Sequence, residues 1–158
     1  MAMASELLYP KRPRGGTCAL PAPFISHMKK TRVLLVDDEA AFTTLCSIWL
    51  EESGYFVTRA ENCGSSVLAT ARSFRPELIF LDMHLPDKTG LEIAAELQAD
   101  HDLTAVPVVL LTGALTNEEA AERRMRGMPA VAKPVAGGEL VQAAIQFLGE
   151  RAPITIHQ

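Results

Sequence analysis

The sequence predicts an α/β domain in which a parallel sheet of five strands is covered by helices on both of its faces. Three observations predict this class. From Thr31 onward, short runs of β-forming residues alternate with helical stretches, which is the pattern of parallel strands joined by crossover helices. Several runs, VLLV, LIFL and VPVVLL, are apolar almost without interruption, as expected of strands buried on both faces. The 158 residues are enough for one such domain and too few for two.

Five strands and five helices are expected to alternate along the chain. The strands are Arg32–Val36, Tyr55–Ala60, Glu77–Leu81, Val106–Leu111 and Ala130–Ala132. The helices cover residues 40–53, 63–74, 90–99, 117–126 and 138–149. Residues at the helix ends support these bounds, because Gly54 follows the first helix and Gly127 follows the fourth. Thr116 and Glu119 form a capping box at the start of the fourth helix.

The two ends of the chain differ from this body. Residues 1–27 are rich in proline, glycine and small residues and show no sustained period, so we expect a flexible N-terminal extension. The domain itself is expected at residues 28–150, and residues 151–158 form a C-terminal tail. Because only these eight residues follow the last helix, we expect no attached output domain in this chain, which would either stand alone or be one piece of a longer protein.

Charge and hydropathy exclude several classes of protein. Residues 1–32 carry six Lys/Arg against one Glu, whereas residues 33–158 carry nine Lys/Arg against eighteen Asp/Glu. An acidic body is a poor partner for nucleic acid. No apolar run approaches the roughly 18 residues of a membrane span, and the start resembles neither a secretory signal nor a transit peptide. We therefore expect a cytoplasmic protein that contacts neither nucleic acid nor membrane.

Polar side chains stand directly after four of the expected strands. Asp37 and Asp38 follow the first strand, Asp82 the third, Thr112 the fourth and Lys133 the fifth. The carboxyl ends of parallel strands meet at one edge of the sheet, where the connecting loops form ligand sites. These five side chains are therefore expected to converge on one site.

The five residue types suit phosphoryl transfer to a carboxylate. Mg²⁺ prefers oxygen ligands and is usually held by one or two carboxylates together with water, so Asp38 and Asp82 can bind it directly and Asp37 through water. Clustered carboxylates repel one another, which gives a cation a reason to bind. Asp82 stands alone between the other groups and is the expected nucleophile. Mg²⁺ and the ammonium of Lys133 would offset the charge of the transferring oxygens.

The segments VLLVDDE, LIFLDMHLPDKTG, VVLLTGA and AVAKPV resemble the receiver domain of response regulators in two-component signalling, of the chemotaxis-regulator kind. The resemblance covers about residues 31–150. The spacing is more specific than any single motif, because Pro86 and Gly90 follow Asp82, the acidic pair lies about 45 residues before it and the Lys-Pro pair about 50 residues after it. The resemblance implies the flavodoxin-like strand order 2-1-3-4-5.

The resemblance also implies a role for each site residue. Asp82 would be the phosphoacceptor of a phosphoprotein, with the acidic pair Asp37 and Asp38 binding Mg²⁺. The backbone carbonyl of His84 would complete the metal shell. Thr112 would be the switch hydroxyl that bonds the new phosphoryl group, and Lys133 would pair with that group and precede a cis peptide bond to proline.

Partners follow from the resemblance as well. The phosphoryl donor would be the phosphohistidine of a sensor histidine kinase or of a phosphotransfer protein. The receiver would catalyse only its own phosphorylation and dephosphorylation, and would act on an unidentified output protein or as a homodimer. On the first helix, Leu45 and Trp49 are expected in the core, whereas Ile48, with Thr44 and Ser47, is expected to face solvent and to be available to a kinase helix.

The sequence departs from the family at the position three residues before the lysine, where receivers usually carry Tyr or Phe and this chain has Ala130. That aromatic moves with the switch hydroxyl, so the coupling of Thr112 to the surface of the fourth helix, fifth strand and fifth helix is expected to differ. Two further positions tune the lifetime of the acyl phosphate in the family, and they are His84 and Ala114 here. A methyl group cannot position water, so we expect the lifetime to depend on access past His84.

Two other functions remain open at this point. A Mg²⁺-dependent phosphohydrolase with an aspartyl nucleophile would share the acyl-phosphate chemistry, but it typically needs an acid/base Asp where this chain has His84. A degenerate receiver would act as an unphosphorylated interaction domain. The five intact chemical positions disfavour this second function, whereas Ala130 mildly favours it.

Overall fold

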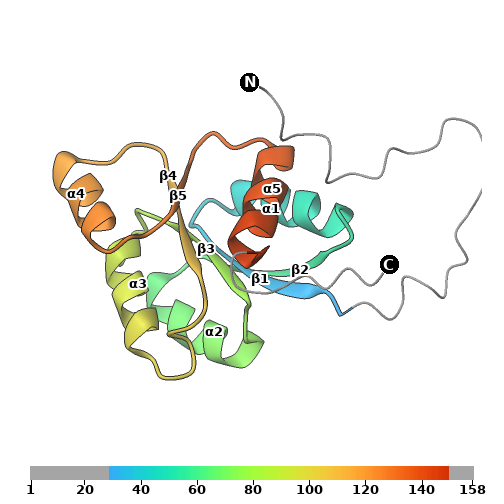
Figure 1. The fold of residues 1–158 in the computed structure, drawn as a ribbon, viewed down its shortest axis with the longest axis horizontal. Helices are drawn as coiled ribbons and strands as arrows, with labels where there is room; N and C mark the ends of the chain where they lie inside the picture. Colours follow the sequence, from blue (N-terminus) through green and yellow to red (C-terminus); the bar gives the residue numbers. More distant parts are fainter. Residues whose placement is uncertain (1–28, 150–158) are drawn as a thin grey trace, which may run out of the picture.

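The computed structural model describes residues 29–149, so the expectations for residues 1–27 and 151–158 lie outside the described residues. Five parallel strands form one sheet in the order β2-β1-β3-β4-β5, which confirms the expected order (Figure 1). The strands are β1 (Thr31–Val36), β2 (Phe56–Glu61), β3 (Leu78–Asp82), β4 (Val108–Thr112) and β5 (Ala130–Ala132). The helices are α1 (Ala40–Glu52), α2 (Val67–Phe74), α3 (Gly90–Ala99), α4 (Asn117–Met125) and α5 (Gly137–Gly149), with the short 3₁₀ turn η2 (Gly64–Ser66) before α2.

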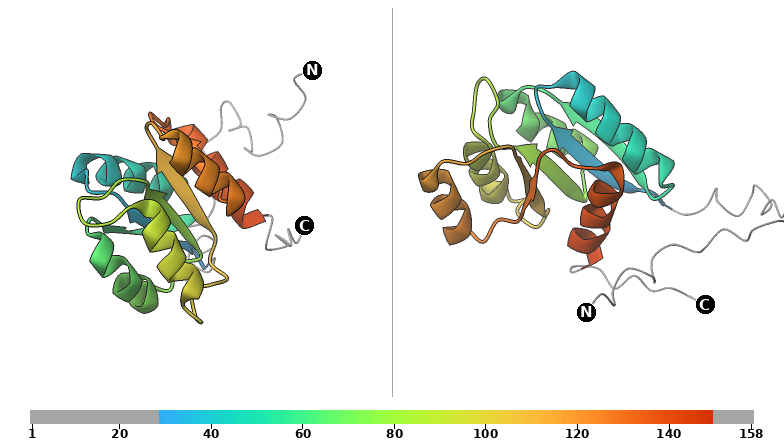
Figure 2. Two further views of the ribbon diagram at one scale, coloured as in Figure 1. Left: turned by 90° about the vertical axis from the view of Figure 1, so that its left-hand side faces the viewer. Right: turned by 90° about the horizontal axis from the view of Figure 1, so that it is seen from above.

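Helices cover the sheet on both faces (Figures 1 and 2). Alternate residues of each strand point to opposite faces, and two apolar clusters result. On one face, Leu35 and Phe80 pack with residues of α1 and α5. On the other face, Leu34 and Leu81 pack with residues of α2 and α3. Phe80 is fully buried, and burial of a side chain of this size stabilises the fold by about 1.5–3 kcal/mol.

Most elements differ from the sequence-based expectation by one residue at an end, and the starts of two differ by more. β4 begins at Val108 rather than Val106, because Pro107 has no N–H to donate and Val106 N–H closes a turn onto Leu103 O at 2.9 Å. The helix expected from residue 63 begins instead as the 3₁₀ turn η2.

The inner face of α1 also differs from the expectation. Leu45 was expected in the core but is 43% exposed, whereas Thr43, Cys46 and Leu50 are buried. Thr43 can be buried because its hydroxyl donates to Ala40 O at 3.1 Å. The helix is therefore rotated relative to the prediction.

No helix among residues 29–149 is long and apolar enough to cross a membrane.

Candidate functional site

The polar residues that follow the strands lie together at the carboxyl edge of the sheet, as predicted. Asp82 and Thr112 are the last residues of β3 and β4 and are each 8% exposed. Asp37 follows β1 directly and is 2% exposed. The neighbouring Asp38 is exposed to solvent. Two of the three carboxylates are thus held inside the protein, while the third faces the medium.

The three carboxylates form one cluster. One oxygen of each of Asp37, Asp38 and Asp82 lies within 4.8 Å of the others. Asp37 also shapes the local backbone, because its Oδ1 accepts a hydrogen bond from Glu39 N–H at 2.9 Å. Oxygen ligands at this spacing fit a hard divalent cation such as Mg²⁺, which needs only one or two carboxylates from the protein.

Lys133 supplies the positive charge of the site. Its ammonium forms a short hydrogen-bonded ion pair with Asp37 Oδ2 and lies 3.4 Å from Asp82 Oδ1. The same ammonium lies 4.5 Å from the centre of the Phe42 ring, which is within the range of a cation–π contact. Lys133 N–H donates to Thr112 O at 2.7 Å, and the following bond to Pro134 is cis, as expected.

The surroundings shift the pKa of both central groups. Burial raises the pKa of the Asp82 carboxyl, and the charge of Asp37 raises it further, while Lys133 acts in the opposite direction. Burial alone would lower the pKa of Lys133, but its hydrogen bond to Asp37 and the two carboxylate charges outweigh burial and raise it. The lysine therefore stays charged, and Asp82 is a more basic carboxylate than an exposed aspartate.

The loop after β3 is tied down on both sides. Gly90 N–H donates to Met83 O at 2.7 Å, and a Cβ at Gly90 would lie 2.6 Å from the Asp82 carbonyl oxygen. Asp87 accepts hydrogen bonds from Gly64 N–H and Ser65 N–H at 2.9 and 2.8 Å. These bonds lower the pKa of Asp87 to about 2. The loop that carries the backbone around Asp82 is thus fastened to η2.

Of the expected tuning positions, His84 lies in this loop, Ala114 follows β4 and Ala130 begins β5. The ring of His84 is 56% exposed, and its Nε2 lies 2.7 Å from Glu119 Oε1 at the start of α4. Ala114 is exposed and Ala130 is partly buried. The structure thus gives the side chain of His84 a partner on α4, which the sequence had not suggested.

Three residues near the site were not predicted from the sequence as parts of it. They are Phe42, which contacts Lys133; Asp87, which fastens the loop; and Glu119, which contacts His84. Glu119 was predicted only as half of the capping box, which is present. For Phe42 the available signal was its position on the helix that begins just after the acidic pair, one turn beyond Asp38.

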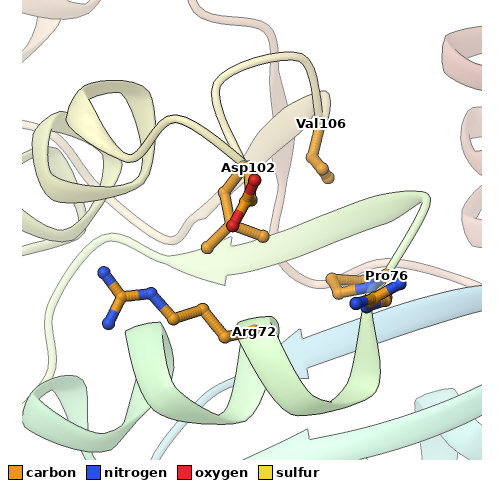
Figure 3. Close-up of a pocket in the computed structure, with 6 residues that line it drawn as sticks. Arg72, Pro76, Asp102 and Val106 are labelled. Carbon is orange, nitrogen blue, oxygen red and sulfur yellow. The ribbon is translucent and has the colours of Figure 1, made fainter.

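A separate surface pocket of about 300 Å³ lies far from these residues (Figure 3). Arg72 and Pro76 line it from α2 and from the segment that leads into β3, and Asp102 and Val106 line it from the segment before β4. These segments are at the amino ends of the strands, the opposite edge from Asp82. The pocket plays no part in the chemistry described above.

Comparisons with known proteins identify the family of this chain. The model of the response regulator receiver domain family matches residues 33–145. Over 114 residues the chain is 37% identical to the probable transcriptional regulatory protein TcrX of Mycobacterium tuberculosis, which covers 69% of this chain and 46% of TcrX. Over 119 residues it is 31% identical to the polar-differentiation response regulator DivK of Brucella anthropi, covering 75% of this chain and 96% of DivK. The crystal structure of chemotaxis protein CheY4 of Vibrio cholerae has the same fold, with a TM-score of 0.69, 24% identity and coverage of 75% and 99%.

The strand order and the polar carboxyl edge define a doubly wound α/β protein with its site at the ends of the strands. Within that class, the chain belongs to the response regulator receiver domain family of two-component signalling. The chain spans less than half the length of TcrX, so the regulatory activity in that protein's name is not carried over to this one.

Proposed function

We propose that this protein is a phosphorylation switch in which Asp82 accepts a phosphoryl group from the phosphohistidine of a sensor histidine kinase or of a phosphotransfer protein. The observation that carries the proposal is the position of the Asp82 carboxylate, buried beside two further carboxylates and 3.4 Å from the ammonium of Lys133. A carboxylate oxygen of Asp82 forms a bond to phosphorus while the P–N bond of the donor breaks. The imidazole that leaves takes up a proton.

Each residue of the site has a part in this step. Asp37, Asp38 and Asp82, with the backbone carbonyl of His84, would hold Mg²⁺, which supplies positive charge against the transferring oxygens. Lys133 is already beside Asp82 and needs only to exchange part of its contact with Asp37 for the new phosphoryl oxygens. Thr112 ends the neighbouring strand β4, from which its hydroxyl would bond the phosphoryl group.

The donor would approach over α1, which begins three residues after Asp37. Ile48 is 45% exposed and Leu45 is 43% exposed, and one helical turn separates them. Thr44 is also exposed on this helix. Leu45 and Ile48 would offer an apolar strip, with the hydroxyl of Thr44 beside it, to a kinase or phosphotransfer helix. The chain would work in the cytoplasm and would pass its signal to an output protein or through a homodimer.

Dephosphorylation would depend on His84 and Ala114. The exposed methyl group of Ala114 can neither orient water nor form an ion pair, so the ring of His84 is the group that would control the approach of water. We expect His84→Ala to change the dephosphorylation rate of the Asp82 acyl phosphate several-fold, as followed by intact mass after removal of the donor. An unchanged rate would contradict this role.

The test of the proposed function is direct phosphorylation. The protein is incubated with Mg²⁺ and acetyl phosphate, and its intact mass is measured. We expect the mass of one phosphoryl group to be added to the unmodified protein, and we expect no addition to Asp82→Asn. Asp102→Asn, which changes an exposed carboxylate remote from the site, should accept the group as the unmodified protein does.

Other outcomes would favour the other two functions. Turnover of acetyl phosphate without a detectable adduct would favour a phosphohydrolase. Neither adduct nor turnover would favour a receiver that binds its partners without phosphorylation. Addition of a phosphoryl group to Asp82→Asn would show that another residue is the acceptor.

A further inference from the structure

α4 lies at the outside of the molecule and buries none of its side chains (Figure 1). Its sequence, NEEAAERRM, is almost entirely polar apart from two alanines, and Met125 at its end is 89% exposed. A helix of nine residues is marginal in water without an apolar face packed on the protein. Only the flanking Leu115 and Met128 join the apolar core. α4 is therefore held mainly by its ends and by polar contacts.

Two side-chain contacts tie α4 and its C-cap to segments that come before them in the described chain, in addition to the bond that Arg123 donates to Met128 O at 2.8 Å just after the helix. At the first turn, Glu119 Oε1 lies 2.7 Å from His84 Nε2. At the other end, Arg126 donates to Leu91 O at 3.1 Å. The second contact reaches a helix backbone, which is a fixed partner. The first contact reaches the loop that follows Asp82.

His84 joins this helix to the proposed phosphoacceptor. It lies two residues after Asp82, and its backbone N–H acts to lower the pKa of the Asp82 carboxyl, while its side chain contacts Glu119. One residue is therefore next to Asp82 through its main chain and in contact with α4 through its side chain. A phosphoryl group on Asp82 adds charge and acceptor oxygens next to this residue, and those oxygens compete with Glu119 for the donors of His84.

Packing gives α4 no comparable connection to the sheet. Ala130 of β5 presents only a methyl group and is partly buried, and within residues 29–149 α4 makes no extensive contact with any other helix or strand. We infer that the hydrogen bond between the side chains of His84 and Glu119 couples the phosphorylation state of Asp82 to α4. Glu119 is in this sense a positioning residue for His84. The inference rests on the proposed function, because it requires that Asp82 be phosphorylated.

The experiment measures amide hydrogen exchange of the segment 115–128 in the full chain. Exchange is compared with and without acetyl phosphate in the presence of Mg²⁺, and intact mass gives the phosphorylated fraction of each sample. In the unmodified protein we expect phosphorylation to speed exchange of α4 several-fold. In Glu119→Ala, amide exchange of α4 should already be fast without acetyl phosphate, and it should not change on phosphorylation.

Two control variants separate the hydrogen bond between His84 and Glu119 from the stability of the helix itself. Thr116→Ala breaks the capping box but leaves the contact of Glu119 with His84. Glu118→Ala removes an exposed charge from the same turn. Both variants should keep the response to phosphorylation, even where their unphosphorylated exchange is faster.

The inference is overturned if amide exchange of α4 in Glu119→Ala responds to phosphorylation as it does in the unmodified protein. It is also overturned if α4 of the phosphorylated unmodified protein shows no change in exchange.

If acetyl phosphate adds no mass to the unmodified protein, the proposed function is wrong, and the contact between His84 and Glu119 is then tested without phosphate. In that case, His84→Ala should speed amide exchange of α4 when it is introduced into the unmodified protein. It should have no effect on that exchange when it is introduced into Glu119→Ala. Equal effects in both backgrounds would show that the two side chains act independently.

Discussion

At the scale of single residues, the site places a carboxylate where its charge is costly. Burial and the neighbouring Asp37 raise the pKa of Asp82, and Lys133 offsets only part of this shift. An acid whose pKa is higher in the folded than in the unfolded chain stabilises the fold below its unfolded pKa of about 3.9, and this contribution is lost as the pH rises through the folded pKa. At pH 7 the folded protein thus bears the cost of a charged Asp82.

Removal of this charge should therefore stabilise the protein. We expect Asp82→Asn to raise the free energy of unfolding by about 1 kcal/mol at pH 7 without divalent cations, because the amide has a similar shape and is not repelled by Asp37. Urea denaturation at several pH values measures the effect. The difference in the free energy of unfolding between Asp82→Asn and the unmodified protein should become smaller towards pH 3, where Asp82 of the unmodified protein is itself protonated. A variant less stable than the unmodified protein at pH 7 would show that the contact with Lys133 outweighs the cost of burial.

The residues of the site differ in how far the sequence could predict them. Asp37, Asp82 and Lys133 follow runs of buried β-formers, so strand periodicity alone predicted their place at one edge of the sheet. Phe42 and Glu119 act through contacts between separate elements. Their positions depend on the rotation of α1 and on the path of α4, which periodicity does not determine.

At the scale of elements, the loop between β3 and α3 is the part of the site with least freedom. Gly90 begins α3 directly against the backbone of Asp82 and Met83. Thr89 caps the helix with its hydroxyl, which accepts from Glu92 N–H at 3.2 Å. Because Asp87 is bonded to η2, the loop cannot move away from a larger side chain without breaking those bonds.

Gly90→Ala should therefore damage both stability and the site. A Cβ would lie 2.6 Å from Asp82 O and 3.0 Å from Met83 Cα, so we expect a loss of about 1–3 kcal/mol in the free energy of unfolding and slower phosphorylation by acetyl phosphate. Gly138→Ala is the matched control, because nothing lies within 4 Å of its Cβ in α5, and it should be neutral or stabilising by up to about 1 kcal/mol. Equal stability of the two variants would mean that the loop adapts to the methyl group.

The elements themselves were predicted well where periodicity decides and less well where contacts decide. The wholly apolar run of β3 is buried on both faces, as predicted. The inner face of α1 was predicted incorrectly, since Leu45 is exposed and Thr43 is buried. A threonine whose hydroxyl donates to a backbone carbonyl of the preceding turn can be buried in a core. A hydropathy pattern does not predict this.

At the scale of the whole molecule, the site joins parts of the chain that are far apart in sequence. Asp37 and Lys133 are 96 residues apart and form one ion pair, and Asp82 comes from the central strand between them. A ligand bound by these side chains would therefore contact β3 and the segments that follow β1 and β5. Ligand binding and folding are then linked, because the unfolded chain does not bring these groups together.

Mg²⁺ should consequently stabilise the folded protein. At a free concentration ten times its dissociation constant, a cation that binds only the folded state adds about 1.4 kcal/mol to the free energy of unfolding. Thermal unfolding in increasing MgCl₂ measures this rise, with NaCl of equal ionic strength as the control for screening. Asp38→Asn should need a higher Mg²⁺ concentration for the same rise in Tm while changing the metal-free Tm little, because Asp38 is exposed. An identical response of Asp38→Asn and the unmodified protein would place the cation at another site.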